Sequence, residues 1–207
     1  MYQSNLETRL SLVERVRDPS DAAAWAEFVT VYQPLLTAYL RKRGVNETDA
    51  ADIVQEVFTR LVPAMARFQL DHRRGRFRTW LWQVAHTAMI DWTRRRAVRT
   101  RAEQQWADDH ELQASPSPDD AWNELYRERI LEVTLKRVRE SAQPTAWACF
   151  EGRILADRPA AQIAAELGVS TNVVYVNASR LLARVREECA QFAESLAESP
   201  TESSVEK

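Results

Sequence analysis

The spacing of apolar residues between positions 77 and 101 predicts a long amphipathic helix, FRTWLWQVAHTAMIDWTRRRAVRTR. Apolar side chains recur there at three- and four-residue steps, which places them on one stripe of a helix. The stripe that we expect to be buried consists of Phe77, Trp80, Leu81, Val84, Ala85, Ala88 and Trp92. The opposite side holds Thr79, Gln83, His86, Thr87, Thr93 and Arg94, with Trp82 at its border. Five arginines then crowd the end: Arg94, Arg95, Arg96, Arg99 and Arg101. The pattern therefore predicts one core face and one face suited to nucleic acid.

The segment before this helix has helical periodicity of its own. We expect helices over residues 5–17 and 21–43, separated by Asp18-Pro19-Ser20, with Ser20 as the cap of the second helix and a bend allowed at Pro34. Asn46 or Thr48 begins another helix. Its residues Ile53, Val57 and Leu61 are four apart and should be buried, whereas Asp52, Gln55 and Glu56 form a separate polar patch. Without further context, such a patch is most simply a solvated face.

The second half of the chain predicts helices at about 119–140 and 145–155 and then a helix-turn-helix over 158–184. Pro159 suits the first turn of one helix, Gly168 the turn, and Ser170 the cap of the next helix. On that second helix we expect Val174, Ala178, Leu181 and Val185 to face inward. The candidate groove or phosphate contacts are Asn172, Val173, Tyr175, Val176, Asn177, Ser179, Arg180 and Arg184. The alternative is an ordinary helical hairpin.

Composition and charge favour an all-α protein of two small helical domains joined by an acidic flexible linker. The 207 residues include only four glycines, and strand alternation is not evident. Residues 60–101 contain eleven arginines and two aspartates, a balance of +9. Residues 102–126 contain seven acids and no Lys or Arg, a balance of −7, and Ser115-Pro-Ser-Pro118 marks a linker. This segregation predicts a basic surface for a polyanion and a separate acidic element.

A cationic loop precedes the long helix. Residues 68–76 contain His72, three arginines and Gly75, and Phe68 and Phe77 border them. Such a loop suits single-stranded nucleic acid, because phosphates attract the cations and unstacked bases stack on aromatic rings. The signal is weak alone, and for Phe77 and Trp80 a role as core anchors is the better interpretation.

Several classes of function lack their signatures in this sequence. Cys149 and Cys189 lie forty residues apart without metal-ligand spacing, so we expect free thiols and neither metal nor cofactor. The chain shows no phosphate-binding glycine loop and no nucleophile paired with a base, which favours a protein that is not an enzyme. No window is apolar enough for a membrane span or leader, so we expect a soluble, cytoplasmic protein without membrane partners.

Three pieces in this order resemble one family: DAADIVQEVFTRL, then FRTWLWQVAHTAMIDWTRRR, then the C-terminal helix-turn-helix. They resemble the extracytoplasmic-function (ECF) sigma factors of the sigma-70 family over roughly residues 20–190. The resemblance implies a region 2-like domain at 1–98, a linker at 99–122, a region 4-like domain at 123–190 and an acidic tail at 191–207. Such a protein would bind core RNA polymerase and promoter DNA, melt the −10 element and recognise the −35 element. An anti-sigma factor or other regulatory protein is a further partner that the family allows.

The resemblance also implies site residues. Contacts to polymerase would come from Asp52, Gln55 and Glu56. Contacts to the −10 region would come from His72, Arg73, Arg74, Arg76, Thr79, Trp82, Gln83, His86, Thr87, Arg94, Arg95 and Arg96. Contacts to the −35 region would come from Ser170, Thr171, Asn172, Tyr175, Asn177, Ser179, Arg180 and Arg184. Thr87 stands where the family commonly has Asn, and Val173, Tyr175 and Asn177 stand where Thr and basic residues are frequent. The usual promoter preferences are therefore not expected to transfer unchanged.

Two other functions fit parts of the same pattern. One is a helix-turn-helix transcription regulator that binds DNA without polymerase. The other is a helical scaffold protein whose arginine-rich stretch is a solvated face. Polymerase binding by the polar patch on the 46–61 helix would distinguish a sigma factor from the first alternative. Nucleic-acid binding by the arginine cluster would distinguish it from the second.

Overall fold

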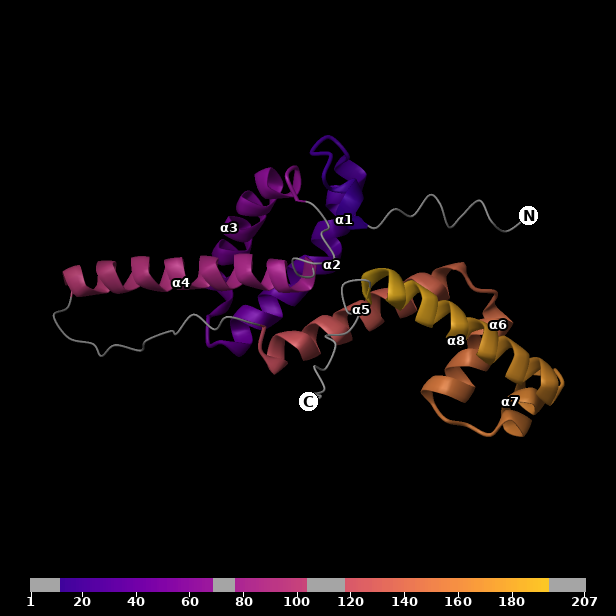
Figure 1. Ribbon diagram of the computed structural model, residues 1–207. Coiled ribbons are helices and arrows are strands. Elements are labelled where there is room, and N and C mark those ends of the chain that lie inside the picture. The colour runs from indigo at the N-terminus through magenta and orange to yellow at the C-terminus, as the bar shows by residue number, and fades with distance from the viewer. Residues whose placement is uncertain (1–11, 69–76, 104–117, 194–207) are drawn as a thin grey trace, which may run out of the picture. The chain divides into compact units, whose positions relative to one another are not determined.

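The computed structural model describes residues 12–68, 77–103 and 118–193, for residues 97–103, 191 and 193 the backbone alone. Every regular element of these residues is helical, which confirms the predicted all-α class. The elements are α1 (Leu12–Arg15), α2 (Ala22–Lys42), α3 (Glu47–Met65), α4 (Phe77–Glu103), α5 (Asp120–Ser141), α6 (Pro144–Phe150), the π-helix η1 (Glu151–Leu155), α7 (Ala160–Leu167) and α8 (Thr171–Ala193) (Figure 1).

The chain divides into two compact units, residues 1–129 and 130–207, and the division falls inside α5. Helix α4 continues to Glu103 and α5 begins at Asp120, so helices occupy both ends of the segment predicted as a linker. The middle of that segment, 104–117, lies outside the described residues, as do residues 5–11 of the first predicted helix and most of the predicted tail. The functional domain boundaries stay a prediction.

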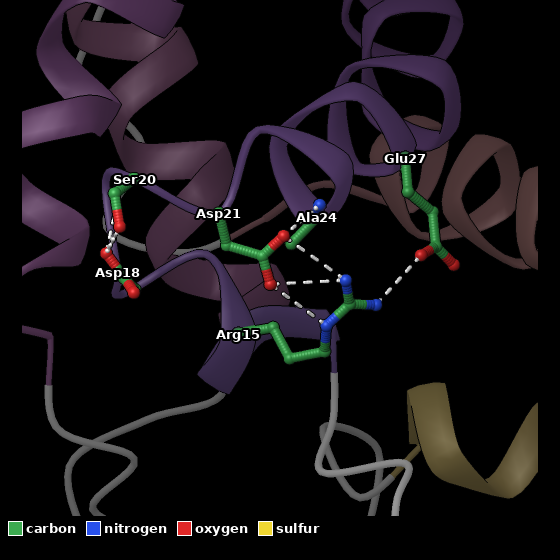
Figure 2. Close-up of polar contacts among 6 residues, drawn as sticks. All are labelled: Arg15, Asp18, Ser20, Asp21, Ala24 and Glu27. Carbon is green, nitrogen blue, oxygen red and sulfur yellow. Dashed lines mark hydrogen bonds and ion pairs between the residues drawn. The ribbon is translucent and has the colours of Figure 1, made fainter.

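The junction between α1 and α2 is fixed by carboxylates (Figure 2). The side chain of Asp21 accepts a hydrogen bond from the Ala24 amide at 2.8 Å, so Asp21 caps α2. Arg15 of α1 pairs with Asp21 at 3.2 Å and with Glu27 at 3.3 Å. The prediction that Ser20 is the cap is wrong, because the amide and hydroxyl of Ser20 donate to Asp18 instead. Those two hydrogen bonds lower the pKa of Asp18.

Helices α2, α3 and α4 form the core of the N-terminal unit. Of the two predicted caps, Asn46 and Thr48, Asn46 is the one that caps α3, and Ile53, Val57 and Leu61 are buried as predicted. Phe77, at the start of α4, packs edge-on against Phe28 and Tyr32 of α2, with ring centroids 5.9 and 5.4 Å apart. Helix α2 continues past Pro34 as one element. The core is therefore built around aromatic contacts between α2 and α4.

The C-terminal unit has two small cores. One joins α5, α6 and α8 through Val138, Trp147, Phe150, Leu181 and Val185. The other joins α6, α7 and α8 through Cys149, Ala160, Ile163, Ala164 and Val174. Gly152 of η1 approaches Ile163 so closely that a Cβ at position 152 would lie 2.9 Å from its terminal methyl group. Val174, Ala178, Leu181 and Val185 are all buried, as the helix-turn-helix pattern predicted.

Candidate nucleic-acid interface

The turn between α7 and α8 has the geometry that the motif needs. Gly168 is left-handed with φ of 65°, and the Val169 amide donates to the Ala164 carbonyl at 3.0 Å. A left-handed residue after a helix favours glycine, because a Cβ crowds the backbone there. The Ser170 hydroxyl accepts from the Val173 amide at 3.3 Å, as expected of a cap. Pro159 precedes α7 as its N-cap rather than lying in its first turn.

Helix α8 exposes most of the predicted contacts. Exposed side chains are Ser170, Thr171, Asn172, Val173, Tyr175, Val176, Ser179 and Arg180. Asn177 and Arg184 are half-buried, and the Arg184 guanidinium donates to the Ser141 hydroxyl of α5 at 2.9 Å. The same guanidinium lies 3.9 Å from Glu188, which is buried. The structure therefore ties Arg184 to its own unit, while the first two turns of α8 present a continuous outer face.

Helix α4 presents a narrower polar face than predicted. Gln83 and Thr87 are exposed and Thr79 is half-buried, and these three lie at four-residue steps along one side of the helix. Arg94, Arg95 and Arg96 are exposed, and Arg96 pairs with Asp49 of α3 and stacks over Trp92 with 5.1 Å to the ring centroid. The polar line and the arginine cluster are thus on one rigid helix.

The expected exposure of Trp82 and His86 is wrong. Only 2% of Trp82 and 5% of His86 is accessible, and their rings stack with centroids 4.8 Å apart. Both reach Tyr39 of α2: the Trp82 indole N–H donates to its hydroxyl at 3.1 Å, and His86 Nδ1 lies 3.2 Å from the same oxygen. The periodicity of α4 alone missed this, because α2 covers a second side of the helix. The useful signal was a tryptophan and a histidine four residues apart, a pair that can stack on one helix side.

Hydrogen bonding and burial both bear on the charge of the His86 ring. The Tyr39 oxygen accepts from Trp82, and its hydroxyl hydrogen can be donated to His86 Nδ1 when that nitrogen is unprotonated, as in one form of the neutral ring. Burial, with a smaller effect from Arg43, lowers the pKa of His86. Burial raises the pKa of Tyr39. His86 Nε2 is buried without a hydrogen-bond partner, so a positive charge on this ring is disfavoured.

The three residues of the polar patch of α3 differ in exposure. Asp52 and Gln55 are exposed, whereas Glu56 is half-buried and pairs with Arg60 at 2.9 Å. Arg60 also pairs with Asp91 of α4 at 3.0 Å. Burial alone would lower the pKa of Arg60, but the hydrogen bonds to both carboxylates outweigh it and raise that pKa. Glu56 is therefore held in place from α4, a constraint that the sequence pattern did not reveal.

Four of the predicted −10 contacts belong to the cationic loop before α4. These residues, His72, Arg73, Arg74 and Arg76, lie outside the described residues. The aromatic residues at its two ends meet: Phe68 is 5.8 Å from Phe77 and 4.6 Å from Trp80 between ring centroids. Phe77 is buried and Trp80 half-buried, so their interpretation as core anchors is confirmed for Phe77 and fits Trp80.

The fold and surfaces define an all-helical protein with a helix-turn-helix unit and a second helical unit that carries an arginine-rich helix. Residues 28–99, from α2 to α4, match the sigma-70 region 2 family. The chain is 24% identical over 178 residues to the ECF RNA polymerase sigma factor RpoE of Cereibacter sphaeroides, covering 86% of this chain and 93% of that protein. It is also 24% identical over 196 residues to the ECF RNA polymerase sigma factor SigE of Mycolicibacterium smegmatis, covering 95% of this chain and 73% of that protein.

The sigma-70 region 2 match thus covers the N-terminal helices, and over most of its length the chain is similar to two ECF sigma factors. The family match includes the polar patch of α3 and the whole outer line of α4, and it ends before α5. Among the described residues, no helix combines the length and apolarity that crossing a membrane requires.

Proposed function

We propose that this protein is a sigma factor that binds core RNA polymerase through α3, contacts the −10 promoter element through α4 and recognises the −35 element through α8. The observation that carries the proposal is that each of these helices buries an apolar side within its own unit and keeps a line of polar side chains exposed on another side. A rigid helix can present such a line to a partner without ordering cost on binding. In this proposal strand opening uses the binding free energy of unstacked bases and no nucleotide hydrolysis.

The polymerase contact is best tested at Asp52. Because Glu56 already pairs with Arg60, Glu56→Lys would also place two cations together and disturb the α3–α4 contact. Asp52 is exposed, so Asp52→Lys should abolish pull-down by core polymerase and leave the helical circular dichroism unchanged. Glu128→Lys makes the same charge change at an exposed position of α5 and serves as the control. Unchanged pull-down by Asp52→Lys would instead favour a DNA-binding regulator that acts without polymerase.

The arginine cluster is proposed to hold phosphates near the −10 element. Arg94 and Arg95 are exposed at the end of the polar line of α4, where backbone phosphates could approach. Replacing both with Glu should weaken DNA binding. In a plot of log affinity against log salt, the slope should become shallower by about 0.7 to 0.9 for each phosphate that is no longer neutralised. Arg127→Glu, at an exposed position of α5, is the control. An unchanged slope would support the scaffold alternative.

The face of α8 favours A·T pairs. Val173 and Val176 are 38% and 37% exposed, and apolar side chains in the major groove contact thymine methyl groups. Asn172 is exposed nearby and can bind adenine through two hydrogen bonds. Asn172→Ala should cost about 1 to 3 kcal/mol at one base pair and relax the preference there. Glu187→Gln, further along α8, should leave base preference unchanged.

The whole proposal is tested by transcription in vitro. Core polymerase and this protein on a pool of genomic fragments should give discrete start sites that share upstream elements at fixed spacing. Start sites that do not depend on the protein would contradict the proposal.

A further inference from the structure

The first turns of α5 pack on α2, in the N-terminal unit. Trp122 and Tyr126 lie four residues apart on one side of α5 and are almost completely buried, at 0% and 1% accessible. The Trp122 ring meets Tyr39 edge-on at 5.2 Å, and the Tyr126 ring lies 6.4 Å from Tyr32. Two buried aromatic side chains represent a large apolar contact for so short a segment. Figure 1 shows these turns beside α2.

Charge complements this contact. Arg43 pairs with Asp119, and Lys42 pairs with Glu124 at 3.3 Å. The two cations lie at the C-terminal end of α2 and Asp119 immediately precedes α5, so these three charges also suit the dipoles of their helices. Lys42 and Glu124 are about half exposed, and their pair therefore adds orientation more than affinity.

A third contact depends on a proline in α2. Pro34 has no amide hydrogen, so the carbonyl of Thr30, four residues earlier, lacks its helical donor. Arg129 of α5 donates to that carbonyl at 2.6 Å and to the neighbouring Val31 carbonyl at 3.0 Å. Pro34 thus leaves an acceptor on α2, and Arg129 uses it.

We propose that residues 119–129 form an intramolecular latch that closes on α2 in the free protein. The latch lies outside the family match at 28–99. Because α4 and the latch belong to the same unit, residues 104–117 connect two parts of that unit and not the two units. The span between the two DNA-binding units is then set inside α5 and not by the acidic connection. Opening the latch would add residues 104–129 to that span. This last consequence rests on the proposed function.

Hydrogen exchange of the full-length free protein tests the latch. Trp122→Ala and Arg129→Gln should each speed amide exchange in residues 122–129 by roughly tenfold or more, because each removes a contact that orders the segment. Exchange in α6, α7 and the buried part of α8 should not change. Arg127→Gln and Glu128→Gln, both exposed on the same turns, are the controls and should exchange as the unmodified protein does. Equal exchange in all five proteins would overturn the latch.

Pro34→Ala tests the acceptor without touching α5. The new amide hydrogen can satisfy the Thr30 carbonyl, so Arg129 loses its advantage there. We expect slower exchange within α2 but faster exchange in residues 122–129. Pro63→Ala removes a proline from the interior of a different helix, α3, and should leave residues 122–129 unaffected. Unaltered exchange of α5 in Pro34→Ala would overturn the assignment of Pro34 as part of the latch.

Transcription separates the latch from the proposed function. On templates whose two promoter elements are moved closer or further apart, Trp122→Ala should use a wider range of spacings than the unmodified protein, because a longer tether lets the two units reach more arrangements. Identical spacing profiles would overturn the consequence for promoter reach. If exchange reveals the latch but no template is transcribed, the proposed function fails and the latch stands. If templates are transcribed and exchange is insensitive to Trp122→Ala, the latch fails alone.

Discussion

Helices α4 and α8 are the two long helices for which the sequence predicts a DNA-facing side. They differ in how many of their sides are buried. On α8 the buried positions are Val174, Ala178, Leu181 and Val185, all predicted from periodicity. On α4 burial extends to Trp82, His86, Met89 and Ile90, none of which belongs to the stripe that was predicted to be buried. The N-terminal part of α8 has a single covered side, whereas α4 is covered by α3 and, at Trp82 and His86, by α2.

The difference shows what limits a prediction from periodicity. A helix whose neighbours all lie on one side has one apolar stripe, and the width of that stripe follows from the spacing of apolar residues. A helix with neighbours on two sides can bury polar or amphipathic side chains when a neighbour supplies the hydrogen bond. Tyr39 supplies that bond on α2 to both Trp82 and His86. The exposed line of α4 is consequently reduced to Gln83, Thr87 and the arginine cluster.

The largest expected effect distinguishes Trp82 from its neighbour Gln83. Trp82→Ala should lower the free energy of unfolding of the N-terminal unit by about 3 to 5 kcal/mol, because it removes a buried ring and leaves Tyr39 without its donor. Gln83→Ala, one residue away and exposed, should change it by no more than about 0.5 kcal/mol. Urea unfolding followed by circular dichroism measures both. Similar small effects would mean that α2 does not cover this side of α4.

The same contrast on α8 should be somewhat smaller. Leu181→Ala should destabilise the C-terminal unit by about 2 to 3 kcal/mol, near the low end for leucine because its side chain keeps some exposure. Tyr175→Ala removes a larger side chain that is 56% exposed and should leave stability nearly unchanged. The second substitution would then be free to report on DNA binding. A large loss of stability from Tyr175→Ala would indicate that the outer face of α8 is covered.

Much of the architecture was predictable because local chemistry determined it. Asn46 as a cap, Gly168 as a turn and the four inward residues of α8 each depend on neighbours within one or two turns. Three features were not predictable: the burial of His86, the pairing of Arg60 with Asp91, and the docking of Trp122. The first and third depend on α2, and the second on α4, segments distant in sequence. Spacing within one helix contains no information about which side a second helix will cover.

The buried histidine makes the comparison dependent on pH. The pKa of His86 is lowered in the folded state from its ordinary value of 6.5. At pH values between the lowered pKa and 6.5, His86 is therefore protonated in the unfolded chain and neutral in the folded unit. Stability of the N-terminal unit should therefore fall as pH decreases through this window, by at most about 1.4 kcal/mol per pH unit for one proton. Above pH 6.5 His86 is neutral in both the folded and the unfolded state, so its titration no longer changes the free energy of unfolding. His86→Gln should flatten the slope of unfolding free energy against pH, and an unchanged slope would show that other groups produce it.

The smallest predicted effect should be equal in the two units. Gly44 follows α2 with φ of 82°, and the next amide, of Val45, donates to the Leu40 carbonyl at 3.1 Å. Gly168 follows α7 with φ of 65°, and the Val169 amide donates to the Ala164 carbonyl at 3.0 Å. A Cβ at either glycine would meet no atom within 4 Å, so only the left-handed backbone opposes alanine.

Each Gly→Ala substitution should then cost about 1 kcal/mol in its own unit, since an alanine in that conformation pays a backbone penalty of that size. Denaturation of Gly44→Ala and Gly168→Ala, compared with the unmodified protein, measures the two costs. Equal costs would show that the left-handed glycine at the end of a helix contributes the same stability in both units, although the two units bury the sides of their helices differently. A much larger cost at Gly44 would point to Arg43, its neighbour in the chain, because a shifted turn would also disturb the pair with Asp119 of the latch.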